Sequence, residues 1–150
     1  MFRFLAASLM LLSTVADATA ATQQCLRPAD IEAEQAIRFQ TELMVVSDTC
    51  GAQTYTRFTR RNRAVLVAYQ QQMIARFRRD GAARAEARFD SYLTRLANEI
   101  SLRTGAQPVA ALCRDSAGLL ATADTLDNEK FRRYIANRAA NDFDRRRCRN

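Results

Sequence analysis

Apolar residues recur every three or four positions along most of the chain, which predicts a succession of amphipathic helices. The pattern favours five of them, over residues 28–50, 54–80, 82–104, 108–124 and 127–140. Prolines stand at the start of two of these segments and glycines directly follow three, as expected for helix ends. No alternating strand pattern or internal repeat occurs, so the fold class is expected to be all-α.

Segment 28–50 is expected to be the central helix, because residues Leu43–Val46 are apolar on every side. In segment 54–80 only Asn62 interrupts the apolar stripe. Since one or two residues separate 54–80 from 82–104, the two should form an antiparallel αα-hairpin. The alternative is one helix continuous through Gly81, because an internal glycine costs only ~1 kcal/mol. The sequence thus predicts a four- to five-helix antiparallel, up-and-down bundle.

The first 20 residues have the pattern of a cleavable secretory signal peptide. Arg3 precedes an apolar stretch from Phe4 to Val15, and small residues follow at the cleavage positions. Cleavage is expected after Ala20, with Ala18 as the alternative, which leaves residues 21–150 as a single domain. The apolar stretch is too short to serve as a permanent membrane anchor. No transmembrane segment is expected after cleavage, and the protein should be periplasmic or secreted.

Four cysteines in an exported chain predict two disulfides. A metal site is the competing interpretation, but the spacing lacks the C-x-x-C pairs that zinc and iron–sulfur sites usually have. A helix over 28–50 would be roughly 34 Å long, so Cys25 and Cys50 at its two ends should not pair. Cys50 and Cys113 should meet at one pole of the bundle. The predicted bonds are therefore Cys50–Cys113 and, by elimination, Cys25–Cys148.

Residue types needed for common catalytic mechanisms are missing. The chain has no histidine and no G-x-S-x-G, P-loop or G-x-G-x-x-G motif. A carboxylate pair at Glu86 and Asp90 is conceivable, yet both flank the buried face of their helix beside Arg84 and Arg88, which favours solvated charges. We therefore expect no enzyme and no cofactor. Gln40 and Asn62 interrupt apolar stripes and hint at a small ligand cavity.

Arginine dominates the charge of the chain. The formal net charge is +7, and 22 of the 23 basic residues are arginine. They cluster at 57–63, 76–79, 131–133 and 145–149. A guanidinium suits bidentate contact with phosphate, so these clusters suggest an anion-binding surface. The candidate residues for this surface are Arg57, Arg60, Arg61, Arg63, Arg145, Arg146 and Arg147.

The alternative interpretation is that the arginines are ordinary helix-surface charges. Several have acidic partners four residues away, at Glu34–Arg38, Arg95–Glu99, Glu99–Arg103 and Glu129–Arg133. A preference for arginine over lysine can also reflect a GC-rich genome. The aromatic residues interleaved with the clusters, Phe58 and Phe77, lie on the apolar stripe and are expected to be buried.

Two functions from different classes are consistent with these patterns. The first is a non-enzymatic structural, binding or accessory protein of the cell envelope. The second is an arginine-rich binder of an anionic partner such as lipopolysaccharide, an anionic lipid or an acidic polymer. Nucleic acid is disfavoured as a partner because the protein is expected to be exported.

Overall fold

The computed structural model describes residues 26–146, with side chains as far as Asp142, and this part of the chain is all-helical. The predicted signal peptide, Cys25 and Cys148 lie outside the described residues. The helices are α1 (Pro28–Thr49), α2 (Thr54–Arg61), α3 (Arg63–Arg79), α4 (Ala85–Gly105), α5 (Val109–Asp115), α6 (Ala117–Thr125) and α7 (Asn128–Arg146). None of the described helices is long and apolar enough to cross a membrane.

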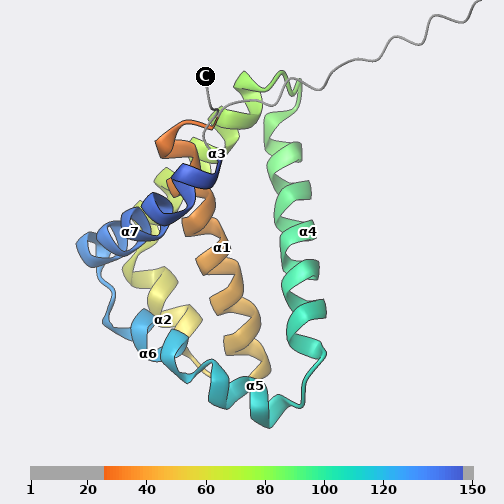
Figure 1. Cartoon of the computed structure of the whole chain (residues 1–150), viewed down its shortest axis with the longest axis vertical. Helices are drawn as coiled ribbons and strands as arrows, with labels where there is room; N and C mark the ends of the chain where they lie inside the picture. Colours follow the sequence, from red (N-terminus) through yellow and green to blue (C-terminus); the bar gives the residue numbers. More distant parts are fainter. Residues whose placement is uncertain (1–25, 147–150) are drawn as a thin grey trace, which may run out of the picture.

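Helix α1 lies at the centre, with α3 and α4 beside it and α7 crossing it on the other side from α4 (Figure 1). The short helices α5 and α6 run across the lower end of the molecule. The prediction for segment 28–50 is confirmed, since α1 contacts every other helix. Its apolar residues Ile37, Phe39 and Leu43 are fully or almost fully buried.

Four aromatic rings form the middle of the core between α1, α2 and α7. Phe39 lies 5.5 Å from Phe58 and 5.3 Å from Tyr134, measured between ring centroids. Phe58 and Phe131 meet edge to face at 4.9 Å. Such edge contacts add stabilisation beyond the apolar area that they bury. Phe58 is fully buried, as the sequence predicts.

The described residues form seven helices, where the sequence predicts four or five. The predicted helix 54–80 is divided into α2 and α3 at Asn62, whose backbone angles of φ −107° and ψ 15° leave the helical region. The Asn62 side chain is buried and donates to the carbonyls of Phe58 and Leu126 at 3.1 and 3.0 Å. This side-chain bonding to backbone explains why the helix bends there.

The predicted helix 108–124 is likewise divided, into α5 and α6 at Ser116. Two predicted stops are confirmed: Gly51 and Gly81 have positive φ angles of 64° and 82°, which close α1 and α3. The alternative of one helix continuous through Gly81 is therefore wrong. A side-chain cap precedes α7, since Asp127 Oδ1 accepts from the amides of Glu129 and Lys130.

The Cys50–Cys113 disulfide is present, with a Cα–Cα distance of 5.7 Å. It joins the end of α1 to α5 at the lower end of the molecule, where α4 also ends (Figure 1). The prediction from helix lengths and directions is therefore confirmed for this pair. The predicted Cys25–Cys148 bond lies outside the described residues and stays a prediction.

Candidate functional site

Two of the four arginines predicted on α2 and α3 for anion binding are used within the chain. The Arg57 guanidinium binds both carboxylate oxygens of Asp124, with its Nη2 at 2.9 and 2.8 Å. Hydrogen bonding from Arg57 lowers the pKa of Asp124. Arg61 donates to the carbonyls of Leu126, Ala123 and Asp124 at 2.8, 2.9 and 3.0 Å. Arg61 thus satisfies carbonyls at the C-terminal end of α6, which a helix leaves unpaired.

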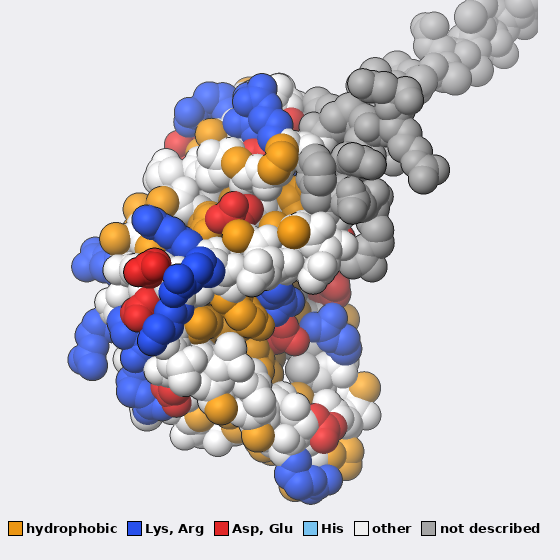
Figure 2. Space-filling view, turned by 60° about the vertical axis from the view of Figure 1, so that its left-hand side comes forward, with side chains coloured by type: hydrophobic (Ala, Val, Ile, Leu, Met, Phe, Trp, Pro, Cys, Tyr) orange, Lys and Arg blue, Asp and Glu red, His pale blue; other side chains and the backbone are white. Residues whose placement is uncertain are grey.

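The other two arginines of this cluster remain open to solvent. Arg60 and Arg63 are exposed, form no ion pair with any described residue, and line an open hollow of about 640 Å³ with Val67 and Asn128. The side chains of Arg145 and Arg146, and the whole of Arg147, lie outside the described residues. On the face of the molecule drawn in Figure 2, Lys and Arg side chains form separate groups, several of them beside acidic side chains.

Some of the arginines form local ion pairs on their own helix. Of the four predicted pairs, Glu34–Arg38 and Glu129–Arg133 are confirmed at 3.5 and 3.2 Å. The other two ion pairs, Arg95–Glu99 and Glu99–Arg103, do not form among the described residues. Glu99 instead lies 3.9 Å from Arg38 and Arg103 lies 3.6 Å from Glu42, so both pairs join α4 to α1.

A buried network of charges joins the first turns of α1 to the end of α3. Asp30 is 2% exposed and accepts from Arg79 Nη2 at 2.6 and 2.7 Å and from Gln72 Nε2 at 2.8 Å. Glu34 is 5% exposed and accepts from Arg76 Nη1 at 2.9 Å. This network was not predicted from the sequence. The sequence does contain a pattern that indicates it: acidic residues lie at the start of α1, and basic residues lie at the end of its antiparallel neighbour α3.

Contacts in this region shift the pKa values of two groups. Burial raises the pKa of Asp30, but hydrogen bonds from Arg79 and Gln72 outweigh this effect and leave the pKa below its usual value. Tyr69 donates to Glu32 Oε1 at 2.6 Å, and both burial and this hydrogen bond raise the pKa of Tyr69. The lowered pKa of Asp30 favours its ionised form and the raised pKa of Tyr69 favours its neutral form, which is typical of a structural role.

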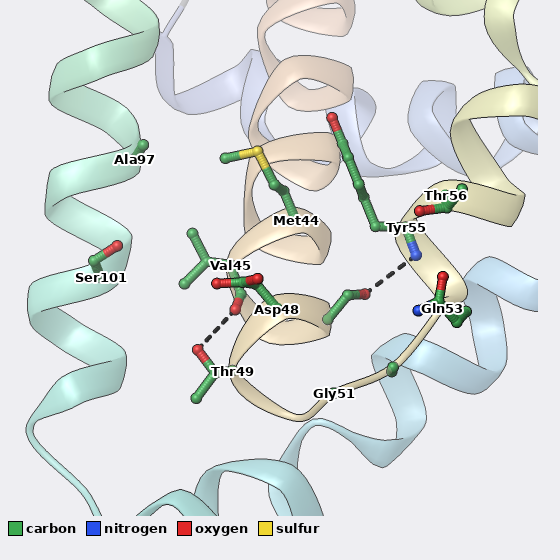
Figure 3. Close-up of a pocket in the computed structure, with 12 residues that line it drawn as sticks. Met44, Val45, Asp48, Thr49, Gly51, Gln53, Tyr55, Thr56, Ala97 and Ser101 are labelled. Carbon is green, nitrogen blue, oxygen red and sulfur yellow. Dashed lines mark hydrogen bonds between the residues drawn. The ribbon is translucent and has the colours of Figure 1, made fainter.

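A cavity of about 660 Å³ lies between the end of α1, the start of α2, and α4. Figure 3 shows Met44, Val45 and Asp48 extending from α1 toward Ala97 and Ser101 of α4. The wall on the other side is positioned by the Tyr55 amide, which donates to Ser47 Oγ at 3.2 Å and holds α2 against α1. The volume is in the range of small-molecule sites, which is roughly 300–1,000 Å³.

Two further hollows continue this cavity along α1 and α4. One of about 400 Å³ shares Met44, Tyr55 and Ala97 with it, and one of about 180 Å³ shares Val45 and Ser101. We call the three together the α1–α4 groove. Asp48 is the one charged residue among those that line it, although 26% of the chain is charged. The rest of the lining combines apolar side chains with hydroxyls and amides.

The other candidate residues have mixed outcomes. Gln40 lines the groove, but Asn62 is buried elsewhere and bonded to backbone, so the two do not form one site. Glu86 and Asp90 are exposed, line none of the cavities described here, and Glu86 pairs with Arg78 at 3.6 Å. The carboxylate pair therefore lacks the burial that its catalytic role would require. No cluster of metal-ligating side chains occurs among the described residues.

Comparisons with known proteins give no further guide, because no family model, characterised protein or solved structure matches this chain.

Proposed function

We propose that the chain is an exported, non-enzymatic binding protein of the cell envelope, and that the α1–α4 groove is its ligand site. The observation that carries the proposal is the near absence of charge along the groove in a strongly charged protein. Mixed apolar, hydroxyl and amide linings are typical of sites for small amphiphilic molecules. The ligand class that fits is a small, uncharged amphiphile.

The groove can be tested with a neutral solvatochromic dye such as Nile red, whose fluorescence shifts to the blue in apolar surroundings. Ala97→Trp fills the middle of the groove and is expected to weaken dye binding at least tenfold. Ala68→Trp, on the exposed surface of α3 away from the described cavities, is the matched control and should bind as the wild type does. Equal binding by both variants would contradict the proposed site.

Export is supported by the Cys50–Cys113 disulfide, since such bonds persist in oxidising compartments. The test is intact-mass analysis of the protein made from the full chain in an exporting bacterial host. Loss of residues 1–20, or of 1–18, together with recovery from the periplasmic or extracellular fraction, is the expected result. An unprocessed chain in the cytoplasmic fraction would contradict export.

The second candidate function is binding of an anionic partner, which we propose as the alternative. Arg60 and Arg63 favour it, because both are exposed and without an ion pair in the described part of the chain. The same charge can instead serve solubility. A salt titration of binding to anionic vesicles, heparin and lipopolysaccharide distinguishes a specific anion-binding role from a role in solubility. Contacts between arginine and phosphate weaken steeply as salt rises. If binding is lost well below physiological salt, the anion-binding function is contradicted and the α1–α4 groove remains as the proposed site of function.

A further inference from the structure

Another hollow, of about 770 Å³, lies where α3 turns into α4 and is separate from the α1–α4 groove. Its walls include Arg76 and Phe77 from α3, Arg84 and Arg88 from the start of α4, and small residues of the turn. We call it the α3–α4 cleft. In Figure 2 a group of basic side chains lies at the top of the molecule, the end at which α3 meets α4 in Figure 1.

The arginines of the cleft differ in how their charges are balanced. Arg76 contacts Glu34 at 2.9 Å and Asp80 at 3.6 Å, so its charge is neutralised within the chain. Arg84 and Arg88 are exposed and form no ion pair with any described residue. Asp80 also lines the cleft, but its ion pair is with Arg76, so Arg84 and Arg88 are the two guanidinium groups of the cleft that have no ion pair with a described residue.

Helix stability does not explain these two arginines. Arg84 stands at the N-cap position of α4 and Arg88 one turn further on, four residues apart. Like charges at this spacing repel each other, and cations at the positive end of a helix are unfavourable. An anionic ligand bound between the two side chains would reverse both effects.

We propose that the α3–α4 cleft binds an oxyanion of the phosphate type through Arg84 and Arg88. Guanidinium groups form bidentate hydrogen bonds with phosphate oxygens, which gives both affinity and orientation. Phe77 and the alanines of the turn line the same cleft and accommodate an apolar group attached to the phosphate. The ligand is thus a phosphate monoester or diester, either as a free molecule or as a lipid headgroup.

This site differs from the anion-binding surface predicted from the sequence. That surface rests on the α2–α3 junction and the C-terminal tail, whereas the cleft lies at the far end of α3. The site is also independent of the α1–α4 groove, so the two proposals can fail separately. Nile red binding should be unchanged in any variant of the cleft.

The test compares two double variants that remove the same charge. Arg84→Gln/Arg88→Gln removes the proposed ligands, and Arg95→Gln/Arg114→Gln removes two other exposed arginines that have no ion pair with described residues. Isothermal titration with phenyl phosphate and with inorganic phosphate measures affinity, and thermal unfolding checks that each variant is folded. We expect at least fivefold weaker binding in the first variant and a change below twofold in the second.

The source of the phosphate is distinguished by vesicles of phosphatidylglycerol, with phosphatidylcholine vesicles as the uncharged comparison. Binding of vesicles without binding of phenyl phosphate identifies a lipid headgroup, and binding of phenyl phosphate identifies a free phosphoester; both support the site. Equal weakening by the two double variants would overturn the proposal, since it would mean diffuse attraction. Greater weakening by Arg60→Gln/Arg63→Gln, or no binding of any probe, would overturn it as well.

Discussion

Asp30 joins the start of α1 to the end of α3 through contacts with Arg79 and Gln72. Asp30→Asn removes the charge but keeps the shape, so Arg79 loses its ionic partner. Breaking a buried pair costs roughly 3–5 kcal/mol, and the partial exposure of Arg79 reduces this to about 1–3 kcal/mol. Urea unfolding at pH 7 should detect this loss. Asp115→Asn, at an exposed position on α5, should change stability by less than about 0.5 kcal/mol.

The effect of Asp30 should depend on pH in one direction. Because the folded state lowers the pKa of Asp30, its contribution is fully present above the unfolded pKa of about 3.9. The contribution disappears as pH falls through the lower folded pKa. The difference in unfolding free energy between the wild type and Asp30→Asn should therefore be constant from pH 7 to 5 and shrink below pH 4. A difference that grows on acidification would contradict this assignment.

Arg61 and Arg60 are neighbours with opposite expected roles. Arg61 makes three hydrogen bonds to carbonyls at the end of α6, whereas Arg60 contacts none of the described acidic groups. Arg61→Gln should lower the free energy of unfolding by about 1–3 kcal/mol, because charged donors to backbone are lost. Arg60→Gln should change it by less than about 0.5 kcal/mol. Similar losses in the two variants, measured by urea unfolding, would show that Arg61 is not a structural cap.

Residue contacts of this kind explain what the sequence could predict about the site. Runs of arginine are visible in the sequence, and they correctly indicate positive charge at 57–63. The partners of Arg57 and Arg61 lie at Asp124 and Leu126, more than 60 residues further along the chain. Only the folded chain brings these groups together. The sequence therefore identified the cluster but not which of its members remain available to a ligand.

At the level of elements, the helical ranges were largely predictable because apolar spacing and glycine stops are local signals. α1 and α4 match the predicted helices 28–50 and 82–104 within a few residues at each end. The divisions at Asn62 and Ser116 were missed. Asn62 bends the chain by donating to the distant carbonyl of Leu126, and a window of neighbouring residues contains no sign of that contact.

Asn62 also gives a prediction for the α2–α3 junction. Asn62→Ala removes the hydrogen bonds to Phe58 and Leu126 and leaves a small void, at a cost of about 1–2 kcal/mol. The Leu126 carbonyl keeps its bond from Arg61, which limits the loss. Far-UV circular dichroism should stay unchanged, because the backbone hydrogen bonds on either side of the junction, Asn62 to Phe58 and Leu66 to Asn62, do not involve this side chain. Asn137→Ala, at an exposed position on α7, is the control, and a loss as large there would contradict a special role for Asn62.

At the scale of the molecule, the Cys50–Cys113 bond fixes one end of the helical assembly. It closes a loop of 63 residues, and such a loop is expected to contribute about 2–4 kcal/mol by restricting the unfolded chain. The bond followed from helix lengths and directions alone. Its presence supports the first step of the pairing argument, from which Cys25–Cys148 was predicted by elimination.

The second pair can be argued from the described residues nearest to it. Gln35 Nε2 donates to Asp142 Oδ2 at 3.0 Å, so the first turns of α1 lie beside the last turns of α7. Cys25 directly precedes Leu26, the first described residue, and Cys148 follows the end of α7 by two residues. The described chain therefore begins and ends in the same region. Since Cys50 and Cys113 are bonded to each other, Cys25 and Cys148 have each other as the remaining partner within one chain.

Peptide mapping without reduction, on protein exported from the full chain, should therefore find Cys25 linked to Cys148. The Cys50–Cys113 peptide serves as the internal control for complete digestion. The variant Cys25→Ser/Cys148→Ser removes this bond and should lower the free energy of unfolding by about 2–4 kcal/mol. The loss is expected because the bond closes a loop that spans most of the chain. A covalent dimer that disappears in this variant would instead mean that the two cysteines join separate chains, and it would overturn the intramolecular pairing.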